Sequence, residues 1–265
     1  MARVDSMDTD EWARRGSSFG AVAAAYAEHR PDYPADAVRW CVAPTGRAVA
    51  GLRVLDLGAG TGKLTAVLAE LGADVTAVEP DEAMLAELRR QLPSVRSLHG
   101  PAEAIPLADG SVDAVLCAQS MHWFDLSRAV PEIARVLVPG GALGAMWNSD
   151  DDRVEWVAGL RGAARGAGAP TLMARRQEAA AFGTGQFGSD LFTPTERAEF
   201  PNAHPRTAQS LLAALGTHSM VLVMTPAERE QLLGQVRDYL ASRPETSDGE
   251  FEVPMVTSVL RSVRR

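Results

Sequence analysis

The sequence predicts an α/β protein built on a mostly parallel β-sheet with helices on both faces. Two observations carry this prediction: apolar runs of strand length alternate with helical patterns between residues 52 and 147, and the first run enters a glycine-rich turn. The runs are apolar throughout, which is typical of strands covered on both faces. Helices are therefore expected on both sides of the sheet.

Residues 52–147 contain five expected strands, of which the third has a weaker pattern than the others. They span residues 52–57, 74–78, 95–99, 112–118 and 142–147. Helices are expected over 63–71 and 81–92, and a third carries Val130, Ile133, Ala134 and Leu137 at helical spacing. This third helix is expected to end at Pro139-Gly140-Gly141, because such residues end helices and begin turns.

The pattern loosens after residue 148. Residues 149–155 are acidic, and 161–188 are rich in Gly, Ala and Arg without a steady period, so we expect a partly helical insertion or a lid over a site. A strand at 195–200, helices at 207–215 and 226–240, and a closing strand at 251–263 follow.

The whole chain, 1–265, is expected to form a single domain. Its expected parts are a helical arm over the site, a cofactor-binding core, the insertion or lid, and C-terminal helices with closing strands, at residues 1–45, 46–148, 149–194 and 195–265.

Composition excludes several classes of function. The net charge of −8 offers no field that attracts phosphate backbones, so nucleic acid is not an expected partner. The two cysteines form no CxxC pair, and Asp150–Asp152 lack the spacing of a calcium loop, so no metal site is expected. The acidic N-terminus does not resemble a secretion signal, and the uncharged stretch 207–227 is too polar for a membrane span, so we expect a cytoplasmic protein. The oligomeric state is not readable.

The glycine-rich turn is the most informative motif. Gly58, Gly60 and Gly62 stand at every second position between a strand and a helix, where positive φ and exposed N–H groups suit a polar or anionic ligand. A phosphate-binding P-loop fails, since leucine occupies both position 57 and position 64. A dinucleotide fingerprint fails as well, because its third glycine would fall one residue later.

The segment Asp56-Leu-Gly-Ala-Gly-Thr-Gly62 resembles the first motif of the class I S-adenosylmethionine-dependent methyltransferases. Glu79, which closes the second strand 17 residues after the last glycine, resembles the ribose-binding acid of such folds. Residues 100–115 and 135–141 resemble later family segments in the same order. The match covers about half of the chain and implies a Rossmann-like, doubly wound sheet of seven strands.

Residues 19–34 and 119–124 resemble the smaller group that includes trans-aconitate methyltransferase. The resemblance implies S-adenosylmethionine as cofactor, with Asp56 near its amino group, Glu79 on its ribose and Tyr26 and Arg30 over it. The remaining implied cofactor-binding residues are Gly58, Ala59, Gly60 and Gly62 under the methionine portion, Pro80 and Met84 near the adenine, Ala102 and Glu103 at the adenine edge, and Gln119 at the fourth strand.

The acceptor side is less defined. His122 follows the fourth strand, and an imidazole titrates near working pH, so it is the candidate catalytic residue, either a base or a hydrogen-bonding group for the acceptor. It could equally be a satisfied loop residue or a wall of the pocket. Trp123 and Trp147 are candidates for substrate contact, with core packing as the alternative.

The function expected from the resemblance is methyl transfer to a small-molecule acceptor by in-line displacement, onto a carboxylate or hydroxyl oxygen. An anionic acceptor would need a local basic patch, for which Arg14, Arg15, Arg175 and Arg176 are candidates. The alternative is a cofactor-binding protein of the same fold that transfers no methyl group, either a regulator or a catalyst of another rearrangement. A nicotinamide oxidoreductase is disfavoured by the glycine spacing and because Lys63, the only lysine, already lies in the turn.

Overall fold

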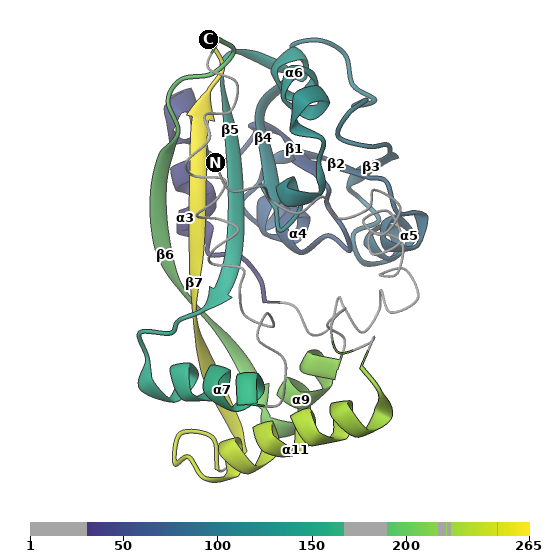
Figure 1. Cartoon of the computed structure of the whole chain (residues 1–265). Coiled ribbons are helices and arrows are strands. Elements are labelled where there is room, and N and C mark those ends of the chain that lie inside the picture. Colours follow the sequence, from purple (N-terminus) through teal and green to yellow (C-terminus); the bar gives the residue numbers. More distant parts are fainter. Residues whose placement is uncertain (1–30, 167–189, 217–220, 222–223, 248) are drawn as a thin grey trace, which may run out of the picture.

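The computed structural model describes residues 31–166, 190–216, 221, 224–247 and 249–265. They form the expected doubly wound fold around one seven-stranded sheet, with strand order β3-β2-β1-β4-β5-β7-β6 (Figure 1). The strands β1 to β5 pair in parallel, and β7 runs antiparallel between β5 and β6. Their bounds are Arg53–Leu57 (β1), Asp74–Glu79 (β2), Arg96–His99 (β3), Val112–Ala118 (β4), Leu137–Asp150 (β5), Glu196–Thr207 (β6) and Glu250–Val263 (β7).

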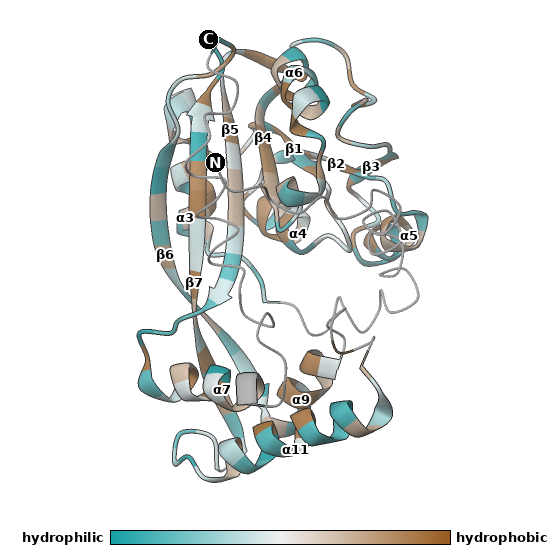
Figure 2. Ribbon diagram, viewed as in Figure 1, coloured by the Kyte–Doolittle hydropathy of each residue, from teal (hydrophilic) through white to brown (hydrophobic). Residues whose placement is uncertain are grey.

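Two apolar layers cover the sheet, as the strand patterns predicted. Val54 of β1 packs in the layer that includes α3 and α4, whereas its neighbour Leu55 packs in the layer with α6, because successive strand side chains point to opposite faces. Figure 2 shows β4 as mostly apolar, in keeping with its burial on both faces, and Asp113 near its start is its one charged residue. The α-helices are Ala35–Val42 (α3), Lys63–Glu70 (α4), Glu82–Gln91 (α5), Leu126–Val136 (α6), Glu155–Gly166 (α7), Ala208–Gly216 (α9) and Pro226–Ala241 (α11).

Strands β5 and β6 are longer than expected. Helix α6 ends at Val136, so the Pro139–Gly141 segment lies inside β5 and does not end the helix. Strand β6 continues past Phe200 through Pro201 and Pro205 to Thr207. Prolines are tolerated there because β6 is the edge of the sheet, where one side of the strand needs no N–H donors.

A third apolar core forms a separate lobe beyond the carboxyl end of β5 (Figure 1). It consists of α7, α9 and α11 packed on the ends of β6 and β7. Helix α7 meets α11 closely: Tyr239 donates a hydrogen bond to the Trp156 carbonyl at 2.7 Å, and a Cβ on Gly159 would overlap the Tyr239 ring. In the described part of the chain, no helix is long and apolar enough to cross a bilayer.

Candidate functional site

The glycine turn joins the carboxyl end of β1 to α4 in left-handed backbone conformations. The φ angles are +70° at Gly58, +58° at Gly60 and +94° at Gly62. A Cβ on Gly58 would lie 2.6 Å from the Cβ of Ser120, whose hydroxyl donates to the Leu57 carbonyl at 2.8 Å. The residue after β1 therefore has to be glycine, because the chain that follows β4 packs directly on it.

Asp56, the fourth residue of β1, is a fully buried carboxyl group. Thr65 of α4 donates its hydroxyl to Oδ2 at 2.6 Å, and Oδ1 has no hydrogen-bond partner among the residues that the structure describes. Burial, with the nearby charge of Glu79 as a smaller cause, raises the pKa of Asp56 to about 7 against the Thr65 hydrogen bond. The site thus holds a buried acceptor atom that lacks a donor.

Glu79 at the end of β2 reaches back to the glycine turn. Its Oε2 accepts the Gly60 N–H at 2.8 Å, and its Oε1 accepts the Asp81 N–H at 2.9 Å. Burial raises the pKa of Glu79, while these two N–H donors lower it. This carboxylate joins β2 to the turn after β1.

The start of α5 and the loop after β3 lie beside this turn. Asp81 caps α5 by accepting from two backbone N–H groups, one of them that of Met84, and the Met84 sulfur lies 3.8 Å from where a Gly60 Cβ would stand. The Pro80 carbonyl is hydrogen-bonded to the His99 ring at 2.9 Å. In the loop, Ala102 is buried in the core.

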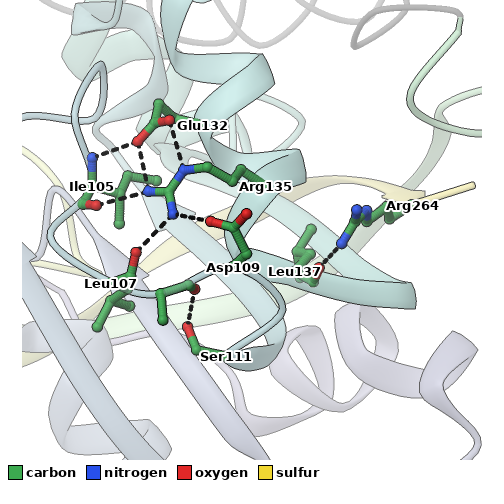
Figure 3. A network of polar contacts seen from close by, with 9 residues as sticks. Ile105, Leu107, Asp109, Ser111, Glu132, Arg135, Leu137 and Arg264 are labelled. Carbon is green, nitrogen blue, oxygen red and sulfur yellow. Dashed lines mark hydrogen bonds and ion pairs between the residues drawn. The ribbon is translucent and has the colours of Figure 1, made fainter.

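Helix α6 holds the loop after β3 at both of its ends. Glu103 accepts the Asp125 N–H at 2.7 Å beside the start of the helix. Near its end, Arg135 donates to Glu132, to Asp109 and to the carbonyls of Ile105 and Leu107, and Glu132 accepts the Ile105 N–H (Figure 3). This network fixes the segment 105–109, and with it the loop that carries Ala102 and Glu103.

Gln119 follows β4 with φ +54°, the only positive φ at a non-glycine residue in the described chain. Its Nε2 donates to the Asn148 carbonyl at 2.9 Å, and its Oε1 is buried with no partner in the described ranges. The Asn148 side chain donates to the Asp32 carbonyl at 3.1 Å and accepts the Thr257 hydroxyl at 2.5 Å. Lys63 forms an ion pair with Asp32 at 3.1 Å. Residue 32 is thus attached to both the glycine turn and β5.

His122 lies in the short 3₁₀ helix η3 (Met121–Trp123), beside two indole rings. Trp147 of β5, 1% exposed, points its Nε1 at His122 Nδ1 at 3.4 Å. Trp123 is 40% exposed, and its ring centroid lies 5.0 Å from that of His122. In the neutral ring, an Nδ1 that accepts this contact leaves the proton on Nε2.

Comparisons with known proteins agree with this geometry. A family model described as a methyltransferase domain matches residues 55–145. An uncharacterized methyltransferase of Mycobacterium tuberculosis is 40% identical over 246 residues, which span 92% of this chain and 95% of the relative. An uncharacterized methyltransferase-like protein of Schizosaccharomyces pombe is 32% identical over 232 residues, or 86% and 87% of the two chains.

A solved structure has the same fold. The structure of a protein from Anaeromyxobacter dehalogenans, assigned as a type II methyltransferase, superposes with a TM-score of 0.59 at 26% identity, covering 89% of this chain and 97% of that chain. The chain belongs to the class I S-adenosylmethionine-dependent methyltransferases. It is an enzyme of the transferase class, and the predicted fold and family are confirmed.

In this methyltransferase, most of the predicted site residues lie at or just after the ends of β1 to β4. Asp56 lies in β1 next to its last residue, the glycines follow β1, Glu79 ends β2, and Gln119 follows β4. Tyr26, Arg30 and the four arginines considered for an acceptor patch lie outside the described residues. No motif predicted the roles of Thr65, Ser120 or Asn148. The signal that could have indicated the first two is that each is a polar residue close to a predicted site residue in the sequence.

Proposed function

We propose that this methyltransferase transfers the methyl group of S-adenosylmethionine to a carboxylate or hydroxyl oxygen of a small-molecule acceptor. The observation that carries the proposal is a pair of buried acceptor atoms, Asp56 Oδ1 and Gln119 Oε1, at the carboxyl ends of the neighbouring strands β1 and β4, for which the described residues offer no donor. Buried polar atoms are nearly always hydrogen-bonded, so a pair of unpaired acceptors suits a ligand that brings N–H donors. The ammonium group of the cofactor is such a donor.

The other residues fit the rest of the cofactor by their chemistry. Backbone N–H groups of the glycine turn suit the methionine portion. Glu79 suits the ribose hydroxyls, which would replace the Gly60 N–H as its hydrogen-bond donors. Apolar side chains suit the adenine ring. The proposed cofactor-binding residues are Tyr26, Arg30, Asp56, Gly58, Ala59, Gly60, Gly62, Glu79, Pro80, Met84, Ala102, Glu103 and Gln119.

The bound cofactor supplies a methyl group on a positively charged sulfur, which is already reactive. The protein has to align the acceptor oxygen with that methyl group and exclude water, and alignment alone contributes about 7–11 kcal/mol in favourable intramolecular models. Since Trp147 Nε1 points at His122 Nδ1, we assign His122 as a hydrogen-bond donor to the acceptor through Nε2. Trp123 borders the acceptor, and Trp147 acts through His122.

Relatives support an oxygen acceptor. A malonyl-[acyl-carrier protein] O-methyltransferase of Methylococcus capsulatus is 37% identical over 151 residues, 51% of this chain and 52% of that enzyme. The resemblance of residues 119–124 to the trans-aconitate methyltransferase group also favours a carboxylic acid. We therefore place carboxylic acids first among the acceptors to be screened.

Calorimetry with S-adenosylmethionine tests the cofactor part of the proposal. Wild type is expected to bind, and Glu79→Ala and Gly60→Ala to bind at least tenfold more weakly. Gly110→Ala is the matched control for Gly60→Ala, because both glycines have φ +58° and a Cβ on Gly110 meets nothing within 4 Å. Equal loss in both glycine variants would show that backbone strain alone weakens binding, against the proposed site.

Transfer of a labelled methyl group into a panel of carboxylic acids and their reduced alcohols tests the reaction. Binding of the cofactor without transfer to any acceptor would favour the alternative, a cofactor-binding protein that transfers no methyl group. The same fold does occur in a protein titled a [4+2]-cyclase, SpnF, at a TM-score of 0.52 and 17% identity. A His122→Gln variant that is no more active than His122→Ala would contradict the donor role.

A further inference from the structure

The guanidinium of Arg161 on α7 has a buried pair of nitrogens with no hydrogen-bond partner among the described residues. Its Nη1 forms an ion pair with Asp152 at 2.9 Å, while Nε and Nη2 are the two nitrogens left unpaired within residues 31–166, 190–216, 221, 224–247 and 249–265. These two atoms form one edge of the planar group, with parallel N–H bonds spaced to match the two oxygens of a carboxylate. Leaving charged donors buried and unpaired is costly, so this edge requires an explanation.

Other arginines of the chain show what this edge ordinarily binds. Arg53, Arg90, Arg135, Arg153 and Arg243 each hold a carboxylate between Nε and Nη2. Arg135 is the closest parallel, because it binds Glu132 on this edge and a second carboxylate, Asp109, on Nη1. One guanidinium in this protein therefore accommodates two carboxylates. Within the described part of the chain, Arg161 binds one carboxylate, that of Asp152 on Nη1.

The position of Arg161 connects it to the carboxyl edge of the sheet. Asp152 lies two residues beyond β5, and Asn148, whose carbonyl accepts from Gln119, lies four residues before Asp152. Four residues of extended chain span at most about 14 Å, which bounds the distance between the Cα atoms of Asn148 and Asp152. In Figure 1 the carboxyl end of β5, two residues before Asp152, points toward the lobe of α7, α9 and α11.

We propose that the Nε–Nη2 edge of Arg161 binds a carboxylate of the acceptor, an inference that rests on the proposed function. A carboxylate held by two N–H bonds is a poor nucleophile, so the oxygen that receives the methyl group belongs to a second group. The acceptor class is then a carboxylic acid that carries a further carboxylate or a hydroxyl. Because both nitrogens are buried in the ligand-free chain, the groups that cover them move when the acceptor binds.

The test measures binding of acetate, succinate, glutarate and tricarballylate, each against its neutral amide, to the protein saturated with S-adenosylhomocysteine. At least one acid with two or more carboxylates is expected to bind wild type at least tenfold more tightly than its amide. Arg161→Lys, which keeps the charge near Asp152 but lacks the parallel N–H pair, is expected to lose that preference. The inference is wrong if no acid is preferred over its amide, or if Arg161→Lys keeps the preference.

Arg153→Lys is the matched control. Arg153 lies in the same segment, but its Nε–Nη2 edge already holds Asp151, so this variant is expected to bind the acids within twofold of wild type. Affinity for S-adenosylmethionine is expected to stay within twofold in both variants, and unfolding of the unliganded proteins checks their fold. If wild type itself does not bind S-adenosylmethionine, the proposed function is refuted, and not only the role of Arg161.

Discussion

A single buried carboxyl group, Asp56, makes cofactor binding depend on pH. Burial raises its pKa to about 7, and only the ionised form attracts the ammonium of the cofactor strongly. Affinity for S-adenosylmethionine is therefore expected to be about tenfold lower at pH 6 than at pH 8, since roughly a tenth of the group is ionised at pH 6. Calorimetry at both pH values measures this ratio.

Asp56 also makes the stability of the unliganded fold depend on pH, but stability falls with rising pH whereas cofactor affinity increases. Its folded pKa lies above the unfolded value, so the unliganded fold loses stability as pH rises from about 4 to 7. Asp56→Asn keeps an acceptor for the Thr65 hydroxyl but has no titrating proton, and both pH dependences are expected to shrink in this variant. Undiminished pH dependence of binding in Asp56→Asn would assign the effect to another group.

Ser120 packs so close to the backbone of Gly58 that only glycine fits at position 58. Gly58→Ala is expected to cost about 2–5 kcal/mol of unfolding free energy, from the left-handed backbone and the overlap with Ser120. Gly46→Ala has a similar φ but open space around the added Cβ, so its cost is expected to be only about 1–2 kcal/mol. Denaturant unfolding of both variants checks the difference, and equal losses would remove the role assigned to the Ser120 contact.

At the scale of elements, α6 positions the loop after β3. Arg135→Ala removes the donors that hold residues 105–109, so affinity for S-adenosylmethionine is expected to fall about three- to tenfold with little change in kcat. Hydrogen exchange of residues 101–109 should rise in the same variant. Arg128→Ala, a change of an exposed residue on the same helix, is the control and should leave both measurements unchanged. Unaltered exchange in Arg135→Ala would contradict this role of the network.

How well each element was predicted follows from its surroundings. Strand β4 was predicted to the residue, since a strand buried on both faces is a continuous apolar run. Strand β6 was cut short at Phe200 because prolines ordinarily end strands, and its place at the sheet edge cannot be read locally. Helix α7 carries Trp156, Leu160 and Ala164 at helical spacing, but it lies between an acidic segment and a stretch rich in Gly, Ala and Arg, so its pattern was not singled out.

The predictability of the site residues also depends on whether their contacts are local in the sequence. The glycine turn and Glu79 are a local motif, and the sequence predicted them as a unit. The bond between Ser120 and the Leu57 carbonyl joins residues 63 positions apart, and that between Arg135 and the Leu107 carbonyl joins residues 28 apart. Such contacts depend on strand order and helix placement, so single-sequence patterns do not predict them.

At the scale of the whole molecule, the lobe has an apolar core distinct from the two layers on the sheet. Leu232→Ala, at a fully buried position of α11, is expected to cost about 2–5 kcal/mol and to accelerate hydrogen exchange in α7, α9 and α11 before β1 to β4. Cofactor affinity should change less than threefold. Leu68→Ala, equally buried beside the sheet, should instead accelerate exchange there. Uniform acceleration in both variants would mean that the two parts unfold as one unit.

The antiparallel pairing of β6 and β7 runs from Glu196 opposite Arg261 to Thr207 opposite Glu250. Helices α9 and α11 therefore leave and return through neighbouring residues of one ladder, about 5 Å apart. Because the two ends of this segment lie close together, it can be exchanged for a segment of different length without shifting the strands. Residues 208–249 could be replaced by a foreign helical pair joined to an unchanged sheet, provided that the new pair offers α7 an apolar face in place of α11.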